Sequence, residues 1–211
     1  YGELCAADTA CSARTNDLAA TMKQVNETMP DSWLMLDIDP GKVQSMAFVM
    51  MFHRGTAVQV IDAYLSAAEG DYSGLALMDL AYDQMLPKMM TWGEFLSKGV
   101  SADYDASRDY SDLADPETVM GSPVSEPVWP VGGEWPMERL PETYNTAQPS
   151  DVETLIVSGN LDFSTPAEAA TDELLPMLSN GQQIILTDMG HTNDWRLENR
   201  DWGNALNSLS K

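Results

Sequence analysis

Two side chains of the types that carry acid–base chemistry follow two apolar runs near the end of the chain. Asp162 comes three residues after Gly159, which ends the first run, and His191 follows Asp188-Met189-Gly190, which ends the second. A carboxylate beside an imidazole can hold the ring in one tautomer and stabilise its cation, so that the ring takes a proton from a serine hydroxyl. The plainer alternative is a loop aspartate and a loop histidine that share no task.

The residues around this pair predict a strand, a helix and a second strand. Residues 152–158 are a β-branched run, Thr165-Pro166-Ala167-Glu168 has the pattern of a capping box, and residues 183–187 are a second apolar run. Short joints make the strands parallel, and reactive groups in such sheets lie beyond the carboxyl ends of the strands. Asp162 and His191 then leave neighbouring loops in the later part of the serine, acid, histidine order of α/β-hydrolases.

A family resemblance covers roughly residues 151–196. It rests on four segments, which read VSGNLDFSTP at 157–166, ELLP at 173–176, NG at 180–181 and GHTNDW at 190–195. Together they closely resemble the C-terminal segment of the tripeptidyl-aminopeptidase-like α/β-hydrolases, which are akin to proline iminopeptidases. A weaker likeness to that family's helical cap is carried by CAADTAC at 5–11 and AAEGDYS at 67–73.

The resemblance implies a fold, a site and an activity. It implies an α/β fold, namely the last parallel strands and helices of an α/β-hydrolase sheet with a mainly helical cap. Residues 1–95 would be the cap, 96–150 a connector rich in proline and tryptophan, and 151–211 the C-terminal part of the sheet domain. Asp162 would be the triad acid and His191 the base of an exported enzyme that removes short peptides from free N-termini or cleaves esters.

One departure from the family pattern concerns the nucleophile, because no Gly-x-Ser-x-Gly elbow occurs in the chain. The nearest imitation is Ser122, but Pro123 has no N–H to help bind the oxyanion. Ser158 lies on the strand that leads to Asp162, so it cannot also occupy a separate nucleophile loop. We therefore expect the serine on an N-terminal part of the same hydrolase, and we expect residues 1–211 to fold stably only beside that part.

The first half of the chain predicts helices. Cys5 and Cys11 could clamp the entry to a helix over residues 16–29 as a disulfide, which would imply export, or could be two small buried thiols. Asp39-Pro40 is a helix-start signal, followed by a mostly apolar pattern over residues 43–68 that breaks at Gly55, and by a further helix over residues 75–90. His53 is expected as a polar helix residue.

Methionines give these helices a thioether-rich face. The alternatives are core filling and a pliable wall for an apolar substrate.

Seven prolines between residues 101 and 150 block regular structure there, and Trp129 and Trp135 predict an ordered connector anchored by its aromatic rings.

Composition excludes several classes of function. Eleven basic residues stand against 33 acidic ones, a formal net charge of −22, so the chain would repel nucleic acid. The acidity favours either simple solubility or a salt-rich habitat. The longest apolar run, residues 46–52, is too short to span a membrane, and no signal peptide, metal motif or cofactor motif is visible.

The rival function is a non-catalytic binding module that kept the hydrolase frame and uses its Met-rich cap and tryptophans to line a ligand site.

Overall fold

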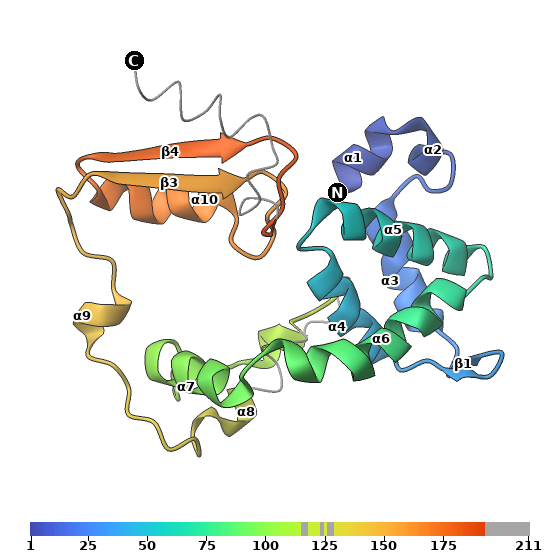
Figure 1. Ribbon diagram of the computed structural model, residues 1–211, viewed down its shortest axis with the longest axis horizontal. Coiled ribbons are helices and arrows are strands. Elements are labelled where there is room, and N and C mark those ends of the chain that lie inside the picture. Colours follow the sequence, from blue (N-terminus) through green and yellow to red (C-terminus); the bar gives the residue numbers. More distant parts are fainter. Residues whose placement is uncertain (115–117, 123–124, 126–128, 193–211) are drawn as a thin grey trace. The chain divides into compact units, whose positions relative to one another are not determined.

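The structure is a computed structural model, and it describes residues 1–114, 118–122, 125 and 129–192. The chain divides into two compact units. The helical unit comprises Tyr1–Met50 and Gln59–Pro141, and the sheet unit comprises Met51–Val58 and the described residues from Glu142 onward (Figure 1). The predicted division at residues 95 and 150 stays a prediction about domains; in the structure most of the connector groups with the helices.

The helical unit is built from helices and one small hairpin. Its elements are α1 (Gly2–Ala7), α2 (Thr9–Ser12), α3 (Leu18–Thr28), β1 (Ser32–Trp33), β2 (Leu36–Asp37), α4 (Pro40–Met50), most of α5 (Arg54–Ala68), α6 (Ser73–Met89) and α7 (Trp92–Ala102). The predicted helices over residues 16–29 and 75–90 are thus confirmed as α3 and α6. The break predicted at Gly55 lies slightly earlier, between Met50 and Arg54, and the hairpin was not predicted.

The core of this unit lies between α4, α5 and α6. Val43, Val60, Tyr64 and Leu75 have no exposed surface, because the apolar sides of three helices close on one another. The start of α4 follows the sequence signal, since Asp39 Oδ1 accepts the N–H of Gly41 at 2.8 Å.

Buried polar groups in this core have partners on neighbouring segments. Asp79, on α6, accepts the N–H of Asp39 at 2.6 Å and thereby ties α6 to the start of α4. The Tyr64 hydroxyl donates to Asn26 Oδ1 of α3 at 2.9 Å, and burial raises the pKa of this phenol. These bonds satisfy groups that would otherwise be costly to bury.

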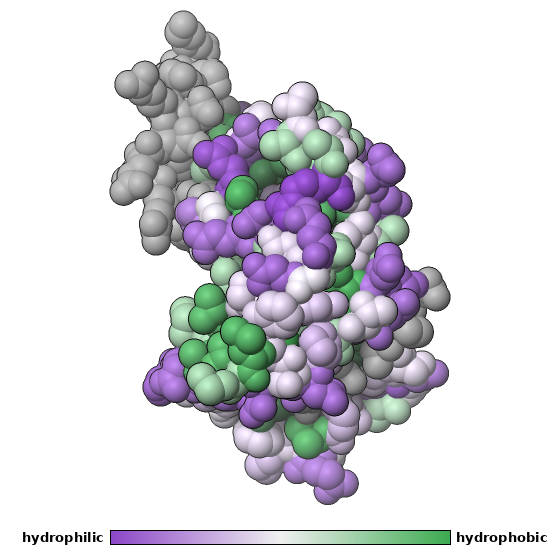
Figure 2. Space-filling model, turned by 90° about the vertical axis from the view of Figure 1, so that its right-hand side faces the viewer, coloured by the Kyte–Doolittle hydropathy of each residue, from purple (hydrophilic) through white to green (hydrophobic). Residues whose placement is uncertain are grey.

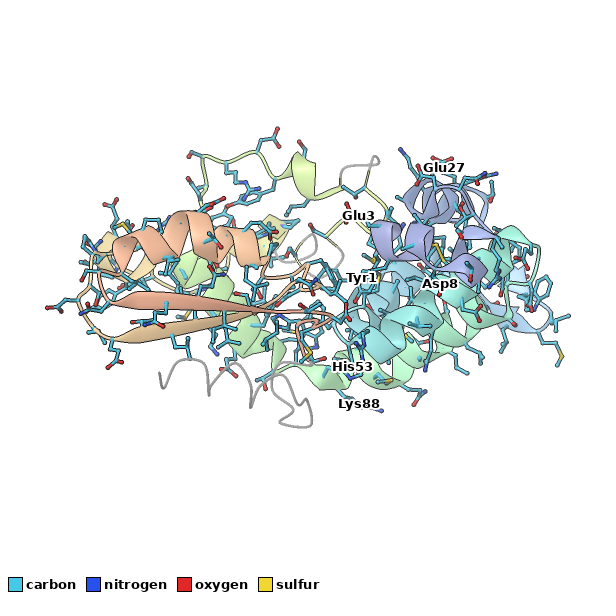
Figure 3. All side chains as sticks on the ribbon, turned by 90° about the horizontal axis from the view of Figure 1, so that it is seen from above. Tyr1, Glu3, Asp8, Glu27, His53 and Lys88 are labelled. Atoms are coloured by element: carbon cyan, nitrogen blue, oxygen red, sulfur yellow. A yellow bond between two sulfur atoms is a disulfide. The ribbon has the colours of Figure 1, made fainter. Side chains whose placement is uncertain are left out.

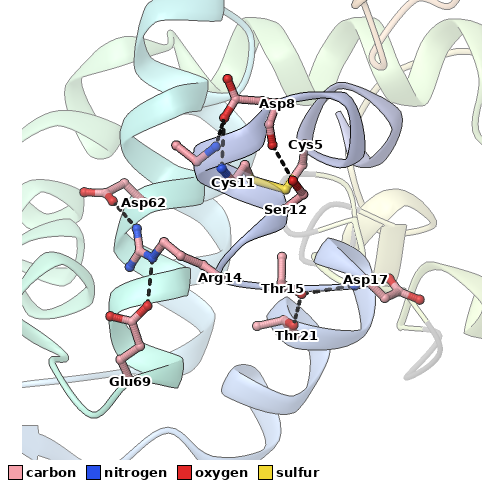
Figure 4. The surroundings of a disulfide bond; sticks show 11 residues. Cys5, Asp8, Cys11, Ser12, Arg14, Thr15, Asp17, Thr21, Asp62 and Glu69 are labelled. Atoms are coloured by element: carbon pink, nitrogen blue, oxygen red, sulfur yellow. Dashed lines mark hydrogen bonds and ion pairs between the residues drawn. A yellow bond between two sulfur atoms is a disulfide. The ribbon is translucent and has the colours of Figure 1, made fainter.

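The N-terminus is fastened by a disulfide and an arginine (Figure 4). Cys5 and Cys11 form the disulfide that was one of the two predicted alternatives, so the buried-thiol alternative is wrong. The Arg14 guanidinium then donates to Asp62 of α5 at 2.6 Å and to Glu69, the residue after α5, at 2.7 Å. These contacts hold the first helices on the surface of α5.

Acidic side chains are exposed on the first helices, and Figure 3 labels Glu3, Asp8 and Glu27 among them. Apolar side chains also reach the surface, and Figure 2 shows them gathered in places between polar ones. The most exposed stand at the turn of the β1–β2 hairpin, where Leu34 and Met35 keep 88% and 97% of their surface exposed.

Some methionines are buried in the core and others are exposed, so neither predicted alternative applies to all of them. Met46 and Met78 are buried and fill the core, whereas Met85 and Met89, at the end of α6, are half exposed. Core filling therefore accounts for the first pair, and the second pair is available to a ligand or another surface.

The connector is anchored by aromatic rings, as predicted. The Trp129 ring, at the start of α8 (Trp129–Gly132), stacks on Tyr110 with centroids 5.0 Å apart. The Trp135 indole donates to Ser97 Oγ of α7 at 3.1 Å. Among the described residues, the predicted connector also contains the second half of α7, a 3₁₀ turn over Ser111–Ala114, and α9 (Glu142–Asn145), which belongs to the sheet unit.

The sheet unit contains the predicted strand, helix and strand. β3 (Thr154–Gly159) pairs in parallel with β4 (Gly181–Leu186) in a register that runs from Thr154 opposite Gly181 to Gly159 opposite Leu186. The helix between them starts as α10 (Ala167–Ala169) and continues through a π turn (Ala170–Leu174) and a 3₁₀ turn (Leu175–Met177). The described chain is therefore a mixture of helices with a small parallel sheet, which agrees with the coarse α/β prediction.

None of the helices in the described segments is long and apolar enough to cross a membrane.

Candidate active site

The two loops that follow β3 and β4 lie against each other, and a glycine makes this possible. A Cβ at Gly159 would stand 2.2 Å from the carbonyl oxygen of Met189, so no larger residue fits without moving the backbone. That carbonyl in turn accepts the N–H of Leu161 at 2.9 Å. Leu161, next to Asp162, is thus hydrogen-bonded to Met189, which lies two positions before His191.

A second contact shapes the turn after β4. Asp188 has the left-handed backbone conformation, with φ of 58°, and its N–H donates to the side-chain oxygen of Asn160 at 2.7 Å. Aspartate is one of the few residues that tolerate this conformation. Asn160 therefore provides a second link between the two loops.

The structure brings the two predicted site residues into contact. His191 Nδ1 lies 3.0 Å from Asp162 Oδ2. The Asp162 side chain is 6% exposed, whereas the His191 side chain is 35% exposed. The arrangement therefore pairs a buried carboxylate with an imidazole that is still open to solvent. A second group can therefore approach the imidazole.

The carboxylate is held by donors besides the imidazole. Its Oδ1 accepts the N–H of Ser164 at 3.0 Å and that of Thr165 at 2.9 Å, and its Oδ2 accepts the Thr165 hydroxyl at 2.6 Å. Burial by itself raises the pKa of Asp162, but the Thr165 hydroxyl, the Thr165 N–H and His191 together outweigh it and hold the pKa below its usual value. Asp162 is thus kept ionised beside the histidine.

The predicted capping box at Thr165 is not formed. The first helical residue is Ala167, preceded by Pro166, and no side chain among the described residues caps this helix start. The helix starts one residue later than predicted, after Pro166, and the Thr165 hydroxyl donates to the carboxylate of Asp162, three residues earlier, in a charge-assisted bond. The capping prediction was wrong, and the difference adds a residue to the site.

A residue from a distant part of the sequence completes the surroundings of the imidazole. The Phe52 ring lies with its centroid 4.9 Å from that of His191 and 5.5 Å from that of Phe163. The Phe52 carbonyl accepts the N–H of Thr192 at 3.1 Å, across 140 positions of sequence. The segment Met51–Val58 therefore belongs to the site, which the local sequence did not indicate.

The remaining predicted residues lie elsewhere. Ser122 belongs to the helical unit, where its N–H donates to the carbonyl of Leu113. Ser158 is buried in β3, and its hydroxyl oxygen accepts the side-chain amide of Gln183 at 3.2 Å. His53 is not inside a helix as predicted but directly precedes α5, where its Nδ1 accepts the N–H of Gly55 at 3.0 Å.

Metal binding has no support in the part of the chain that the structure describes, since no three His, Cys, Asp or Glu side chains there are grouped so that they could hold an ion. This arrangement can act as an acid–base pair, because Nδ1 faces the carboxylate and a histidine has a second ring nitrogen that can exchange a proton. Compared with known protein families, with curated proteins and with solved structures, the chain matches none.

Proposed function

We propose that this chain is the C-terminal part of a serine hydrolase and supplies its acid and its base, Asp162 and His191. The observation that carries the proposal is the 3.0 Å contact between His191 Nδ1 and a buried, ionised Asp162. In this role the carboxylate holds the Nδ1–H tautomer, and Nε2 takes the proton from the attacking serine and returns it to the leaving group. The segments that resemble the tripeptidyl-aminopeptidase-like hydrolases contain both residues.

The nucleophile belongs, in this proposal, to an N-terminal part of the same hydrolase. Two features of the sheet unit support it. The described sheet has two strands, and a sheet that small does not normally hold a stable apolar core. Leu155 on β3 and Ile185 on β4 are 40% and 51% exposed. Further strands or helices would cover such apolar residues.

The proposed substrates are short peptides with a free N-terminus, or esters. Phe52 and Phe163 place apolar rings beside the imidazole, so an apolar group next to the scissile bond would be favoured there. The Cys5–Cys11 disulfide is consistent with an extracellular protein, and we propose that the enzyme is exported.

The test is hydrolysis of a peptide or ester reporter by the protein made from the whole reading frame. We expect activity in that protein, its loss in His191→Ala, and a fall on the order of 10⁴-fold in kcat for Asp162→Asn, as for the acid of other serine hydrolases. The matched control is Asp188→Asn, a loop carboxylate that is half exposed and lies next to the same site. It should retain activity.

Two outcomes would contradict the proposal. If Asp162→Asn had no more effect than Asp188→Asn, Asp162 would not be the triad acid. If the whole protein bound peptides but hydrolysed neither reporter, the rival function, a binding module that kept the hydrolase frame, would be favoured.

A further inference from the structure

The Thr165 hydroxyl lies between the two members of the acid–base pair. Its oxygen is 2.6 Å from Asp162 Oδ2 and 3.3 Å from His191 Nδ1. A threonine hydroxyl has one proton to donate and lone pairs to accept with. If the hydroxyl donates its proton to Asp162, it can only accept a hydrogen bond from His191; if it donates to His191, it is the donor in that contact.

The proton goes to the carboxylate. Asp162 Oδ2 is charged and 0.7 Å closer to the hydroxyl oxygen than Nδ1 is, and bonds to an ionised acceptor are about twice as strong as neutral ones. The hydroxyl oxygen then presents only lone pairs to the imidazole. Nδ1 therefore faces two acceptors, Asp162 Oδ2 at 3.0 Å and Thr165 Oγ1 at 3.3 Å.

Two acceptors at one ring nitrogen require that this nitrogen carry the proton. If Nδ1 were unprotonated, its lone pair would face those of two oxygens, and the contact would be repulsive. We propose that Thr165 is a positioning residue which, together with Asp162, selects the Nδ1–H tautomer of His191 and leaves Nε2 free to act as the base. This role deepens the proposed hydrolase function and rests on it.

Two hydrogen bonds to Asp162, one from the backbone and one from the side chain, fix the position of the Thr165 hydroxyl. The Thr165 N–H donates to Asp162 Oδ1 while its hydroxyl donates to Oδ2, so one residue holds both oxygens of the carboxylate. Pro166 follows and restricts the backbone of Thr165 to extended conformations. The carboxylate therefore cannot rotate away from the imidazole without breaking both bonds to Thr165.

The test compares Thr165→Val with Thr165→Ser in the whole protein. Valine keeps the shape of threonine and removes the hydroxyl, whereas serine keeps the hydroxyl and removes the methyl group. Ser164→Ala is the matched control, because it removes a neighbouring hydroxyl while leaving the N–H that donates to Asp162 Oδ1. Thr165 is an exposed residue, so these changes should leave the fold intact.

The readout is the ¹⁵N spectrum of selectively labelled histidine, taken where the imidazole is neutral, with the His191 signal identified by its loss in His191→Gln. The two ring nitrogens differ strongly in shift between protonated and unprotonated states, so the spectrum reports the tautomer directly. We expect the Nδ1–H tautomer in the wild type, a shift of the tautomer ratio on the order of fivefold toward Nε2–H in Thr165→Val, and recovery in Thr165→Ser.

The outcomes separate this proposal from the hydrolase proposal. A shift in Thr165→Val that serine reverses supports the role of Thr165 whether or not the protein hydrolyses the reporter. If the ratio in Thr165→Val equals that in Ser164→Ala, or if serine fails to restore it, the hydroxyl does not select the tautomer and the proposal is overturned, even if His191 and Asp162 prove essential for hydrolysis.

Discussion

The two units of this chain hold their structure in different ways. In the helical unit, side chains of α4, α5 and α6 such as Val43, Val60 and Leu75 are fully removed from solvent, and a disulfide fastens the N-terminus. In the sheet unit, Leu155 and Ile185 stay 40% and 51% exposed on a sheet of two described strands. The first unit has a closed apolar core, whereas the second has a two-stranded ladder with exposed apolar residues and a hydrogen-bond network around Asp162.

This difference matches the division of tasks in the proposed function. A unit with a closed core can serve as a cap without outside support. A small sheet with exposed apolar residues gains stability when more strands cover it, and its polar network has to be ordered for the acid–base pair to work. The sheet unit is therefore where both stability and chemistry should respond most to change.

Hydrogen exchange should show the largest contrast. The amides of α4, α5 and α6 lie around the closed core, so we expect their exchange to be slower than that of β3 and β4 amides by a factor on the order of 10³ in the chain of residues 1–211. Mass spectrometry or NMR after dilution into D₂O measures this. Equal protection in both units would show that the sheet unit needs no further cover, and would contradict the comparison.

Gly159→Ala should destabilise the sheet unit alone. The added Cβ would stand 2.2 Å from the Met189 carbonyl, which is backbone and cannot rotate away, so we expect a loss of about 2–3 kcal/mol. The loops that bring Asp162 and His191 together would separate. Thermal melting followed by histidine NMR measures both effects.

The control for this change is Gly93→Ala in α7, where an added Cβ meets nothing within 4 Å. Since alanine is a better helix residue than glycine, we expect Gly93→Ala to be neutral or stabilising by about 0.5–1 kcal/mol. If Gly159→Ala behaved like Gly93→Ala, the close crossing of the two loops would be wrong.

Removing the disulfide should affect the helical unit alone. The Cys5–Cys11 bond closes a short loop, so replacing both cysteines with serine should cost about 2 kcal/mol by the loss of its constraint on the unfolded chain. Chemical denaturation measures this, and the histidine spectrum of His191 should not change. A shift of the His191 signal in this variant would mean that the two units do not respond independently.

Acid should loosen the carboxylate network, and this is the smallest effect expected. The pKa of Asp162 is lower in the folded protein than in the unfolded chain, where it is about 3.9. Its contribution to stability is therefore complete above the unfolded value and is lost as the pH falls through the folded one. The Ser164 and Thr165 amides donate to Oδ1, so their protection against exchange, measured relative to an unstructured peptide at the same pH, should fall over that range.

The matching control for the acid effect is Asp162→Asn, in which no carboxylate is left to protonate at this position. The pH dependence of the protection of these two amides should then disappear. Should it persist unchanged in this variant, some other carboxylate would govern the network.

The sequence was most informative where local pattern decides structure. The β-branched run before Gly159 and the apolar run before Asp188 predicted both strands to within two residues, and the parallel pairing followed from their short joints. Asp162 and His191 could be predicted to meet because the loops at the carboxyl ends of neighbouring parallel strands lie side by side.

The rest depended on interactions that sequence pattern does not reveal. Thr165 has the spacing of a capping residue, yet the helix starts after Pro166 and the Thr165 hydroxyl donates to Asp162. Phe52 lies far from His191 in the sequence, and no local signal connects the two. His53 looked like an interior helix residue because the apolar pattern runs through it, yet the helix starts just after it.

The most direct test of the central claim is labelling of the whole protein with a fluorophosphonate that reacts with activated serines. We expect one serine to be labelled, outside residues 1–211, and we expect the labelling to vanish in His191→Ala and to fall steeply in Asp162→Asn. Labelling that is equally strong in His191→Ala, or a wild-type protein that is not labelled at all, would contradict the assignment of His191 and Asp162 as the base and acid of a serine hydrolase.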